Sequence, residues 1–326
     1  MKKEDLRIVF MGTPEFAVET LQMLVNNGYN VVAVVTQPDK PVGRHGSVLQ
    51  PSAVKQYALE HGLPVLQPEK MKDPAFVEQL RSYDANLQVV VAFRMLPEVI
   101  WAMPVYGTFN VHAALLPKYR GAAPINWAVI NGETMTGVTT FFLDHNIDTG
   151  RIIMKKEFPI PDNADVEYVY DGLMHLGAEI CKETLEAIVA ADGHPDTVEQ
   201  ETCNLPLAPK IFKDTCEIDW QKPAKQVYDF VRGLSPYPGA WTTLVNEDGK
   251  RQVLKIYKTR KTGQEATTAP GTITINGRHL YISATDQVLE IVELQLEGKK
   301  RMAASDFLNG MKSLDTYHVK KNSPET

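Results

Sequence analysis

Asn110 and His112 are the two residues whose types and spacing most directly suggest chemistry. They flank Val111 within the segment TFNVHAALLP. On an extended strand alternate side chains point to the same face, so we expect the amide and the imidazole to lie side by side. A neighbouring amide and imidazole can polarise a carbonyl group and transfer a proton. These two residues alone leave open a structural role, in which His112 only satisfies hydrogen bonds.

A carboxylate that could orient this imidazole follows the apolar run 138–143. Asp144 comes directly after that run, and Asp148 begins an Asp-Thr-Gly turn. An amide, an imidazole and a carboxylate are the groups that acyl-type transfer to an amine requires. Zinc binding at His112 and Asp148 is the weaker interpretation, because two ligands without a Cys/His cluster do not make a site. An aspartic-protease centre is equally disfavoured, since it needs two carboxylates in a β-rich fold.

The composition is that of an ordinary globular protein with two domains. The chain has 326 residues, of which 44% are hydrophobic and 23% charged, and this length exceeds the usual size of one domain. No apolar run approaches the roughly 20 residues of a membrane-spanning helix, and the apolar stretch near the N-terminus is too short for a signal peptide. The three cysteines have neither metal-ligand spacing nor an even count. We therefore expect a reduced, cytoplasmic protein.

The first part of the chain alternates strands and helices, which predicts an α/β fold with a doubly wound, mostly parallel, Rossmann-like sheet. The expected strands are 6–11, 31–36 and 87–93, and the expected helices are 15–26, 51–61 and 166–192. Such a sheet binds ligands beyond the carboxyl ends of its strands, where the strand order reverses. The turn after the first strand, Gly12-Thr13-Pro14, lacks the Gly-x-Gly-x-x-Gly spacing, so a dinucleotide site is disfavoured.

The C-terminal part has a different sequence pattern, in which short segments of alternating apolar and polar residues are bounded by turns. The expected strands are 241–245, 252–259, 271–275, 279–284 and 288–296, and the expected helices are 224–234 and 303–311. Five short strands of this kind predict a small β-barrel of the oligonucleotide-binding (OB-like) type. We therefore divide the chain into a catalytic domain (1–205), a C-terminal barrel domain (206–318) and a tail (319–326), with the segment 200–214 as a linker.

The charge is distributed unequally between these parts. Residues 1–209 contain 16 Lys and Arg against 26 Asp and Glu, whereas residues 210–326 contain 18 against 14, and the whole chain has a net charge of −6. A basic C-terminal part on an acidic protein indicates contact with a polyanion such as a nucleic acid. An ordinary fluctuation on a solvated surface is the alternative.

A polar, glycine-containing segment interrupts the first part between residues 36 and 51. It reads QPDKPVGRHGSVLQ and carries Lys40, Arg44 and His45. Its composition predicts an exposed, mobile loop. A basic loop beside a ligand crevice could reach a phosphate backbone, so these three residues are our candidates for nucleic-acid contact.

Two long segments carry a resemblance to a known family. NVHAALLPKYRGAAPINWAVINGE and GVTTFFLDHNIDTG closely resemble the folate-dependent formyltransferases. With MGTPEFA at 11–17, TQPDKPVGR at 36–44 and the basic barrel, the chain is similar to those members that act on charged initiator tRNA. The resemblance covers nearly the whole chain in the family's order. It implies that Asn110, His112 and Asp148 form the catalytic triad.

The same resemblance implies a folate site formed by two loops, comprising Phe93, Arg94, Met95, Leu96, Ala114, Leu115, Leu116 and Pro117. Two positions depart from the family pattern. Ala114 stands where a serine is usual, so a hydroxyl contact to the folate is absent. Phe93 and Arg94 stand where Tyr-Gly is usual, in a loop that is one residue shorter, which puts the conformation of that loop in question.

The activity implied by the resemblance is transfer of a formyl group from 10-formyltetrahydrofolate, the co-substrate, to the α-amino group of initiator methionyl-tRNA. Asn110 and protonated His112 would donate hydrogen bonds to the developing oxyanion, and Asp148 would orient His112. The reaction is redox-neutral, so we expect neither a metal nor a nicotinamide. We also expect a monomer. A formyltransferase with a sugar-amine or ribonucleotide acceptor, a formyl-folate hydrolase and a non-catalytic RNA-binding protein remain as alternatives.

Overall fold

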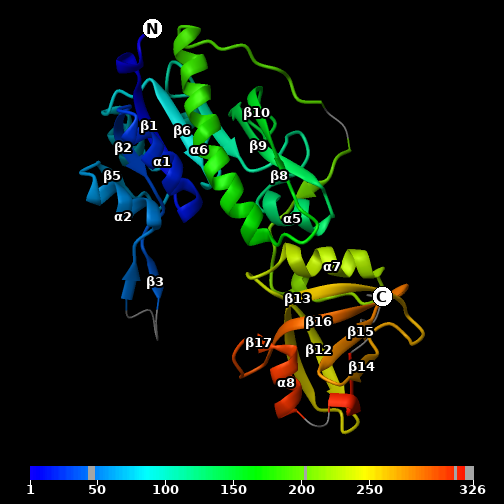
Figure 1. Ribbon diagram of the computed structural model, residues 1–326. Coiled ribbons are helices and arrows are strands. Elements are labelled where there is room, and N and C mark those ends of the chain that lie inside the picture. Colours follow the sequence, from blue (N-terminus) through cyan, green and yellow to red (C-terminus); the bar gives the residue numbers. More distant parts are fainter. Residues whose placement is uncertain (43–47, 202–203, 312–313, 320–326) are drawn as a thin grey trace. The chain divides into compact units, whose positions relative to one another are not determined.

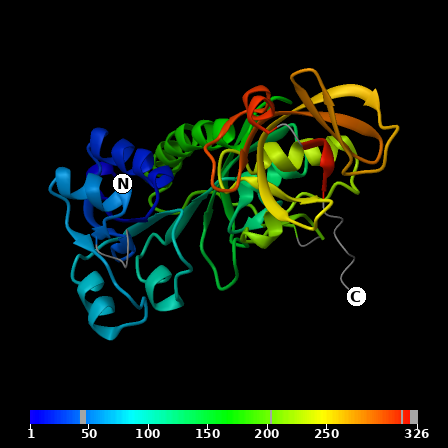
Figure 2. The ribbon, with the colours of Figure 1, turned by 90° about the horizontal axis from the view of Figure 1, so that it is seen from below.

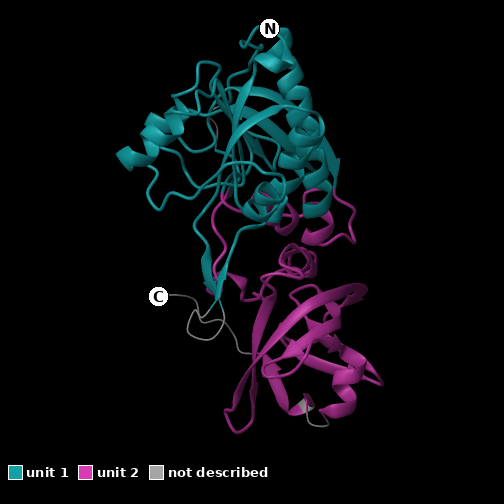
Figure 3. Ribbon diagram, turned by 90° about the vertical axis from the view of Figure 1, so that its left-hand side faces the viewer, with its two compact units in different colours: residues 1–121, 135–159, 170–207 teal, residues 122–134, 160–169, 208–326 magenta. Residues whose placement is uncertain are grey.

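The computed structural model describes residues 1–42, 48–201, 204–311 and 314–319. The chain forms two compact units (Figure 3). Unit 1 contains residues 1–121, 135–159 and 170–207, and unit 2 contains residues 122–134, 160–169 and 208–326. Two segments from the first part of the chain, 122–134 and 160–169, thus group with the C-terminal part, which the division by sequence order does not anticipate.

Unit 1 is built on a seven-stranded sheet with the order β10-β9-β7-β6-β1-β2-β5 (Figure 1). Its strands are β1 (Arg7–Gly12), β2 (Asn30–Val35), β5 (Val65–Leu66), β6 (Leu87–Val91), β7 (Thr108–His112), β9 (Met135–Phe142) and β10 (Ile152–Pro159). The pairs from β5 to β7 are parallel, and β9 and β10 add an antiparallel edge. The sheet is therefore doubly wound and mostly parallel, as expected.

Helices cover both faces of this sheet. They are α1 (Glu15–Asn26), α2 (Ala53–Glu60), α3 (Pro74–Arg81), α4 (Glu98–Trp101) and α6 (Val166–Ala190). On one face α1 and α6 lie together, and the ring of Phe16 meets that of Tyr170 edge-on (Figures 1 and 2). On the other face α3 and α4 bury their apolar side chains against Val9, Met11 and Val90. Burial on both faces explains why the sequences of β1 and β6 are mostly apolar rather than alternating.

The segment expected to be a loop between residues 37 and 50 contains a short hairpin instead. Strands β3 (Lys40–Val42) and β4 (Val48–Gln50) pair antiparallel, so the expectation of an irregular loop was wrong for these six residues. The hairpin extends away from the sheet of unit 1 (Figure 1), and all six of its described residues are exposed. The alternating pattern is too short, and too interrupted by Pro and Gly, to be recognised as strand from sequence.

Unit 2 contains an antiparallel sheet that curls toward closure. Its strand order is β14-β15-β16-β13-β12-β18, with β17 beside β16. The strands are β12 (Ala240–Asn246), β13 (Arg251–Glu265), β14 (Ile273–Asn276), β15 (His279–Ser283), β16 (Gln287–Leu296), β17 (Met302–Ala303) and β18 (Tyr317–Val319). The amide of Val319 donates to the carbonyl of Gly271 at 3.4 Å, which joins the two ends of the sheet. The predicted C-terminal β-barrel is confirmed.

The barrel encloses an apolar core to which two helices contribute. Helix α7 (Ala224–Gly233) buries Val227 and Val231, and α8 (Ala304–Gly310) buries Phe307, in one cluster with Ile291. Among the helices that the structure describes, none combines the length and apolarity that crossing a bilayer requires.

Candidate active site

The predicted site residues lie where the parallel strands of unit 1 end. Strands β1 and β6 are neighbours although β2 and β5 separate them in the chain, so the strand order reverses between them. Ligands of doubly wound sheets bind at such a reversal, outside the carboxyl ends of the strands. Strand β7, next to β6, carries Asn110 and ends at His112. The fold thus places the amide and the imidazole at the edge where a ligand is expected.

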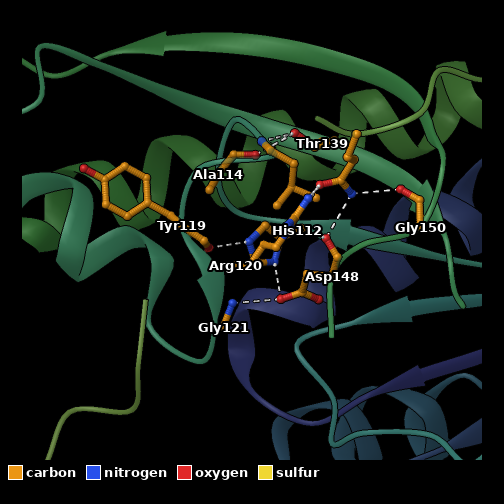
Figure 4. Close-up of polar contacts among 10 residues, drawn as sticks. His112, Ala114, Tyr119, Arg120, Gly121, Thr139, Asp148 and Gly150 are labelled. Carbon is orange, nitrogen blue, oxygen red and sulfur yellow. Dashed lines mark hydrogen bonds and ion pairs between the residues drawn. The ribbon is translucent and has the colours of Figure 1, made fainter. Parts of the chain in front are cut away.

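His112 is buried and has a protein group opposite each ring nitrogen (Figure 4). Its Nε2 lies 2.9 Å from the backbone carbonyl of Tyr119. Because a carbonyl oxygen only accepts hydrogen bonds, Nε2 carries a hydrogen. Its Nδ1 faces Oδ2 of Asp148 at 3.8 Å. That separation is longer than a hydrogen bond, so a substrate atom can approach Nδ1 without breaking one.

The carboxylate of Asp148 therefore faces the ring of His112, as the predicted triad requires. Its Oδ2 also accepts a hydrogen bond from the amide of Gly121 at 2.9 Å. Only 14% of the Asp148 side chain is exposed. A carboxylate with one backbone donor and little water keeps a strong attraction for a nearby positive charge.

Asn110 supplies an unsatisfied polar atom at the same strand end. Its Oδ1 is buried and has no hydrogen-bond partner among the described residues. An unpaired buried amide oxygen is destabilising by roughly 1–3 kcal/mol, and a ligand that pairs with it removes that penalty. Rotating the amide by 180° exchanges its oxygen and nitrogen, so the same position can offer a donor. The Asn110 side chain can therefore form a hydrogen bond with a bound ligand.

The loop after His112 is held by hydrogen bonds to Thr139 of β9. The Thr139 hydroxyl donates to the carbonyl of Ala114 at 2.6 Å and accepts from the amide of Leu116 at 3.1 Å. Lys155 Nζ of β10 donates to the Leu116 carbonyl. The side chains of Ala114 and Leu116 are completely buried. Of the predicted folate residues in this loop, Leu115 and Pro117 keep partly exposed side chains, and the other two can contribute only backbone atoms.

The second predicted folate loop, 93–96, follows β6 and is held by the residue that departs from the family pattern. Arg94 donates to the carbonyls of Pro68 and, at 2.9 Å, of Glu69. Partial burial lowers the pKa of this guanidinium. Phe93 is partly buried below Arg94, Met95 is 71% exposed and Leu96 is buried. The arginine thus gives this loop a fixed attachment, and Met95 is its exposed apolar side chain.

The three residues predicted to contact nucleic acid are only partly described. Lys40 lies at the start of β3 and is exposed. Arg44 and His45 lie outside the described residues. At the base of the hairpin Asp39 pairs with Lys55 at 2.7 Å and accepts a hydrogen bond from Gln67, and the lysine holds the pKa of this carboxyl below its usual value. The hairpin is therefore anchored at its base.

Backbone strain gathers around the candidate site. Five described residues other than glycine have a clearly positive φ, and three of them border the site: Ala92, Tyr119 and Asp148. The left-handed region costs such residues about 1 kcal/mol or more. At Tyr119 the conformation accompanies the carbonyl that meets His112, and at Asp148 it accompanies the carboxylate that faces the ring. Strain of this kind persists only where surrounding contacts enforce it.

Sequence reasoning missed two residues that support Asp148. Arg120 Nε donates to the Asp148 carbonyl at 3.1 Å, and Gln200 Nε2 donates to the same carbonyl at 2.9 Å. Arg120 was visible as part of the PKYRGAAP segment, but Gln200 lies in the expected linker, where no pattern distinguishes it. No cluster of three His, Cys, Asp or Glu residues that could hold a metal occurs within the described part of the chain.

Two family models match the chain. The formyl transferase model matches residues 6–185, and the model for the formyl transferase C-terminal domain matches residues 210–312. Among solved structures, the sugar 3N-formyl transferase WlaRD superposes with a TM-score of 0.65 at 19% identity, covering 90% of this chain and 99% of that one. HypX from Aquifex aeolicus, determined with tetrahydrofolic acid, superposes with a TM-score of 0.60 at 18% identity. The chain spans 47% of HypX, and these similarities concern the fold alone.

Curated relatives are similar along the full length. A methionyl-tRNA formyltransferase from Parabacteroides distasonis is 61% identical over 325 residues, which is 98% of this chain and 100% of the relative. A methionyl-tRNA formyltransferase from Bacteroides fragilis is 56% identical, over 98% of this chain and 99% of the relative. With both parts matched by formyltransferase models and with full-length identity of this size, the chain belongs to the methionyl-tRNA formyltransferase family.

Proposed function

We propose that this protein transfers the formyl group of 10-formyltetrahydrofolate to the α-amino group of initiator methionyl-tRNA. The observation that carries the proposal is the arrangement at the end of β7, where Asp148 faces the buried ring of His112. Beside it lies the amide oxygen of Asn110, which has no partner among the described residues. The family membership supplies the two substrates. Structures of two similarly folded proteins were determined with folates, tetrahydrofolic acid for HypX and 5-N-formyl-THF for WlaRD, which supports a folate as the formyl donor.

The attacking amine must be uncharged. A free α-amino group has a pKa of about 7.7–8.0, and esterification of the neighbouring carboxyl group lowers it further. The neutral form is therefore available near pH 7 without a strong base. The side chains of the site have to hold the formyl group beside the amine and accommodate the charges that develop during attack.

Attack on the formyl carbon forms a carbon–nitrogen bond and moves negative charge to the formyl oxygen. The Asn110 amide is the neutral donor for this oxygen. His112 is the second donor, and its free edge is Nδ1, because Nε2–H is held by the Tyr119 carbonyl. When Nδ1 is protonated, the negative charge of Asp148 compensates the positive charge of the ring. Loss of one such donor typically costs about 3–4 kcal/mol of the barrier.

The protons balance within the same pair of residues. The amine nitrogen loses one proton after attack, and N10 of the folate gains one as its bond to the formyl carbon breaks. Asp148 and His112 together can take the first proton and return the second, so the enzyme ends in its starting state. Neither a metal nor a redox cofactor is required by this sequence of steps.

The surfaces around the triad divide between the two substrates. Met95, Leu115 and Pro117 offer exposed or partly exposed apolar surface at the carboxyl ends of β6 and β7, where the pterin ring would bind. Lys40 on the hairpin, together with Arg44, His45 and the basic barrel of unit 2, would contact the phosphates of the tRNA. This assignment predicts tRNA binding that weakens steeply with salt.

A formylation assay tests the proposal. Wild-type protein, supplied with 10-formyltetrahydrofolate and charged initiator tRNA, is expected to formylate the methionine, while folate release without an acceptor stays at background. The His112→Ala variant should lose about 100-fold or more in kcat. Folate release without tRNA would instead indicate a formyl-folate hydrolase. Formylation of sugar amines or ribonucleotides in place of the charged tRNA would also overturn the proposal.

A further inference from the structure

The catalytic carboxylate is supported by a side chain far away in the sequence. Gln200 lies beyond helix α6, in a segment whose sequence looks like a linker. Its Nε2 donates to the carbonyl of Asp148 at 2.9 Å and to the carbonyl of Gly150 at 2.8 Å. One amide group therefore bridges two carbonyls of the Asp-Thr-Gly turn and fixes their spacing.

Arg120 completes this contact from the other side. Its guanidinium donates to the Gln200 side-chain oxygen, from Nη2 at 2.7 Å and from Nε at 3.1 Å, and Nε also donates to the Asp148 carbonyl at 3.1 Å. With its oxygen held by Arg120, the amide of Gln200 has one orientation, which aims its nitrogen at the turn. We call Arg120 and Gln200 together the carbonyl clamp.

The turn needs such a clamp because its backbone is strained and has no room to shift. Asp148 has a φ of 55°, which a residue with a side chain rarely adopts. Gly150 is packed so closely that a Cβ would meet the Phe142 carbonyl oxygen at 1.6 Å. A residue in the left-handed region stays there only if its surroundings over-determine it. The clamp supplies two donors to the very peptide unit that follows the strained φ.

We infer that Gln200, oriented by Arg120, is a positioning residue for formyl transfer that acts through Asp148. The clamp holds the Asp148 backbone so that its carboxylate points at Nδ1 of His112 rather than into solvent. The inference rests on the proposed function, because it assumes that Asp148 takes part in the reaction. A displacement of about 1 Å in a catalytic group can lower a rate by roughly 100-fold.

The test uses Gln200→Glu in the full-length protein. This change keeps the size of the side chain and the oxygen that Arg120 holds. It removes the two hydrogen bonds that the Gln200 amide nitrogen donates to the carbonyls of Asp148 and Gly150. We expect kcat for formylation to fall about 10- to 100-fold, with little change in KM for either substrate. Glu199→Gln is the matched control, because Glu199 is the preceding residue and its side chain pairs with Arg151 on the surface. The kcat of this variant should stay within about twofold of wild type.

A double-mutant cycle separates positioning from general stability. In an Asp148→Ala background, Gln200→Glu should cause no further loss of kcat, because the group on which it acts is absent. An equal loss in that background, or a wild-type kcat with a lowered melting temperature, would overturn the inference. If Asp148→Ala is slow and Gln200→Glu is as fast as wild type, the positioning role of the clamp is rejected and the proposed role of Asp148 stands. A wild-type kcat for Asp148→Ala rejects the proposed role of the carboxylate and the clamp with it.

Discussion

The candidate catalytic edge of unit 1 and the barrel of unit 2 fix their residues by different interactions. Around Asp148 the backbone is held by single polar contacts from distant residues, above all Gln200 and Arg120. In the barrel, residues such as Ile291 are held by apolar packing shared among many neighbours. Such polar contacts depend on a few specific atoms, whereas apolar packing is distributed over many. Substitutions at the edge should therefore change turnover, and substitutions in the barrel should change stability.

The largest expected effect on stability is that of Ile291→Ala in the barrel. Ile291 is 1% exposed on β16, between β13 and β15, so its truncation leaves a cavity. We expect a loss of about 2–5 kcal/mol in the free energy of unfolding, measured by urea denaturation, with kcat per folded molecule unchanged. Ile275→Ala, at a 37% exposed position of β14, is the control and should lose less than about 1.5 kcal/mol. A fall in kcat at unchanged stability would break the comparison.

Gly150→Ala is the corresponding change at the catalytic edge. The added Cβ would lie 1.6 Å from the Phe142 carbonyl oxygen, so the turn that carries Asp148 must move. We expect kcat to fall about 100-fold in the formylation assay, which corresponds to about 2.7 kcal/mol of barrier. In the control Gly177→Ala, the Cβ makes an ordinary 3.5 Å contact in α6 and kcat should not change. A Gly150→Ala variant with normal turnover would show that the turn tolerates displacement.

Thr139→Val tests the support of the 113–117 loop. The substitution keeps the shape but leaves the Ala114 carbonyl and the Leu116 amide without their hydroxyl partner. We expect a loss of about 1–3 kcal/mol in the free energy of unfolding and a higher KM for the folate. The control lies on the same strand: the hydroxyl of Thr136 is buried and has no partner in the described part of the chain, so Thr136→Val should be neutral or stabilising. Equal effects of both substitutions would contradict the role of the Thr139 hydroxyl.

Arg94→Met tests the attachment of the 93–96 loop. Methionine keeps an apolar stem but cannot donate to the carbonyls of Pro68 and Glu69. Each lost bond is worth about 1 kcal/mol, so we expect KM for the folate to rise about threefold to tenfold while KM for tRNA stays constant. Steady-state kinetics with each substrate varied in turn measures this split. A rise in both KM values would mean that the arginine has a wider structural role.

The smallest effect is expected for the ion pair of Asp162 and Lys261 in unit 2. The lysine lowers the pKa of the Asp162 carboxyl below its usual value. A carboxyl with a lowered folded-state pKa stabilises the fold above its unfolded pKa, near 3.9, and loses that contribution as the pH falls through the folded-state pKa. Because both side chains are more than a third exposed, Asp162→Asn should lose less than about 1 kcal/mol at pH 7. The unfolding curves of the two proteins should differ at pH 7 and approach each other at pH 3.

The barrel and the regular elements could be predicted because their patterns are local. Helix α1 spans 15–26 as the 3.6-residue period indicates, and the alternating segments 279–284 and 288–296 match β15 and β16 closely. Several elements were not predicted, including helix α3 (Pro74–Arg81) and strand β10 (Ile152–Pro159). The three-residue strands β3 and β4 and the two-residue strand β5 carry too few residues for a period to appear.

The proximity of His112 and Asp148 could be predicted, whereas the contacts that hold the Asp148 backbone could not. Asn110 and His112 share a strand face by simple alternation, and Asp148 is part of a recognisable turn. Gln200 acts through a backbone carbonyl 52 residues earlier in the chain, and such a contact leaves no periodic signal in the side chains. Nothing in the sequence indicated that Arg94 attaches its loop, because the carbonyls that accept its hydrogen bonds belong to the separate segment 68–69.

The central claim is that His112 and Asp148 act as one unit on the charge that forms at the formyl group. A double-mutant cycle with His112→Ala and Asp148→Asn, followed by single-turnover formylation of initiator methionyl-tRNA, tests it most directly. Each single variant should be slower by about 100-fold or more, and the double variant should be no slower than the slower single variant. Losses that multiply in the double variant, or an Asp148→Asn variant as fast as wild type, would contradict the claim.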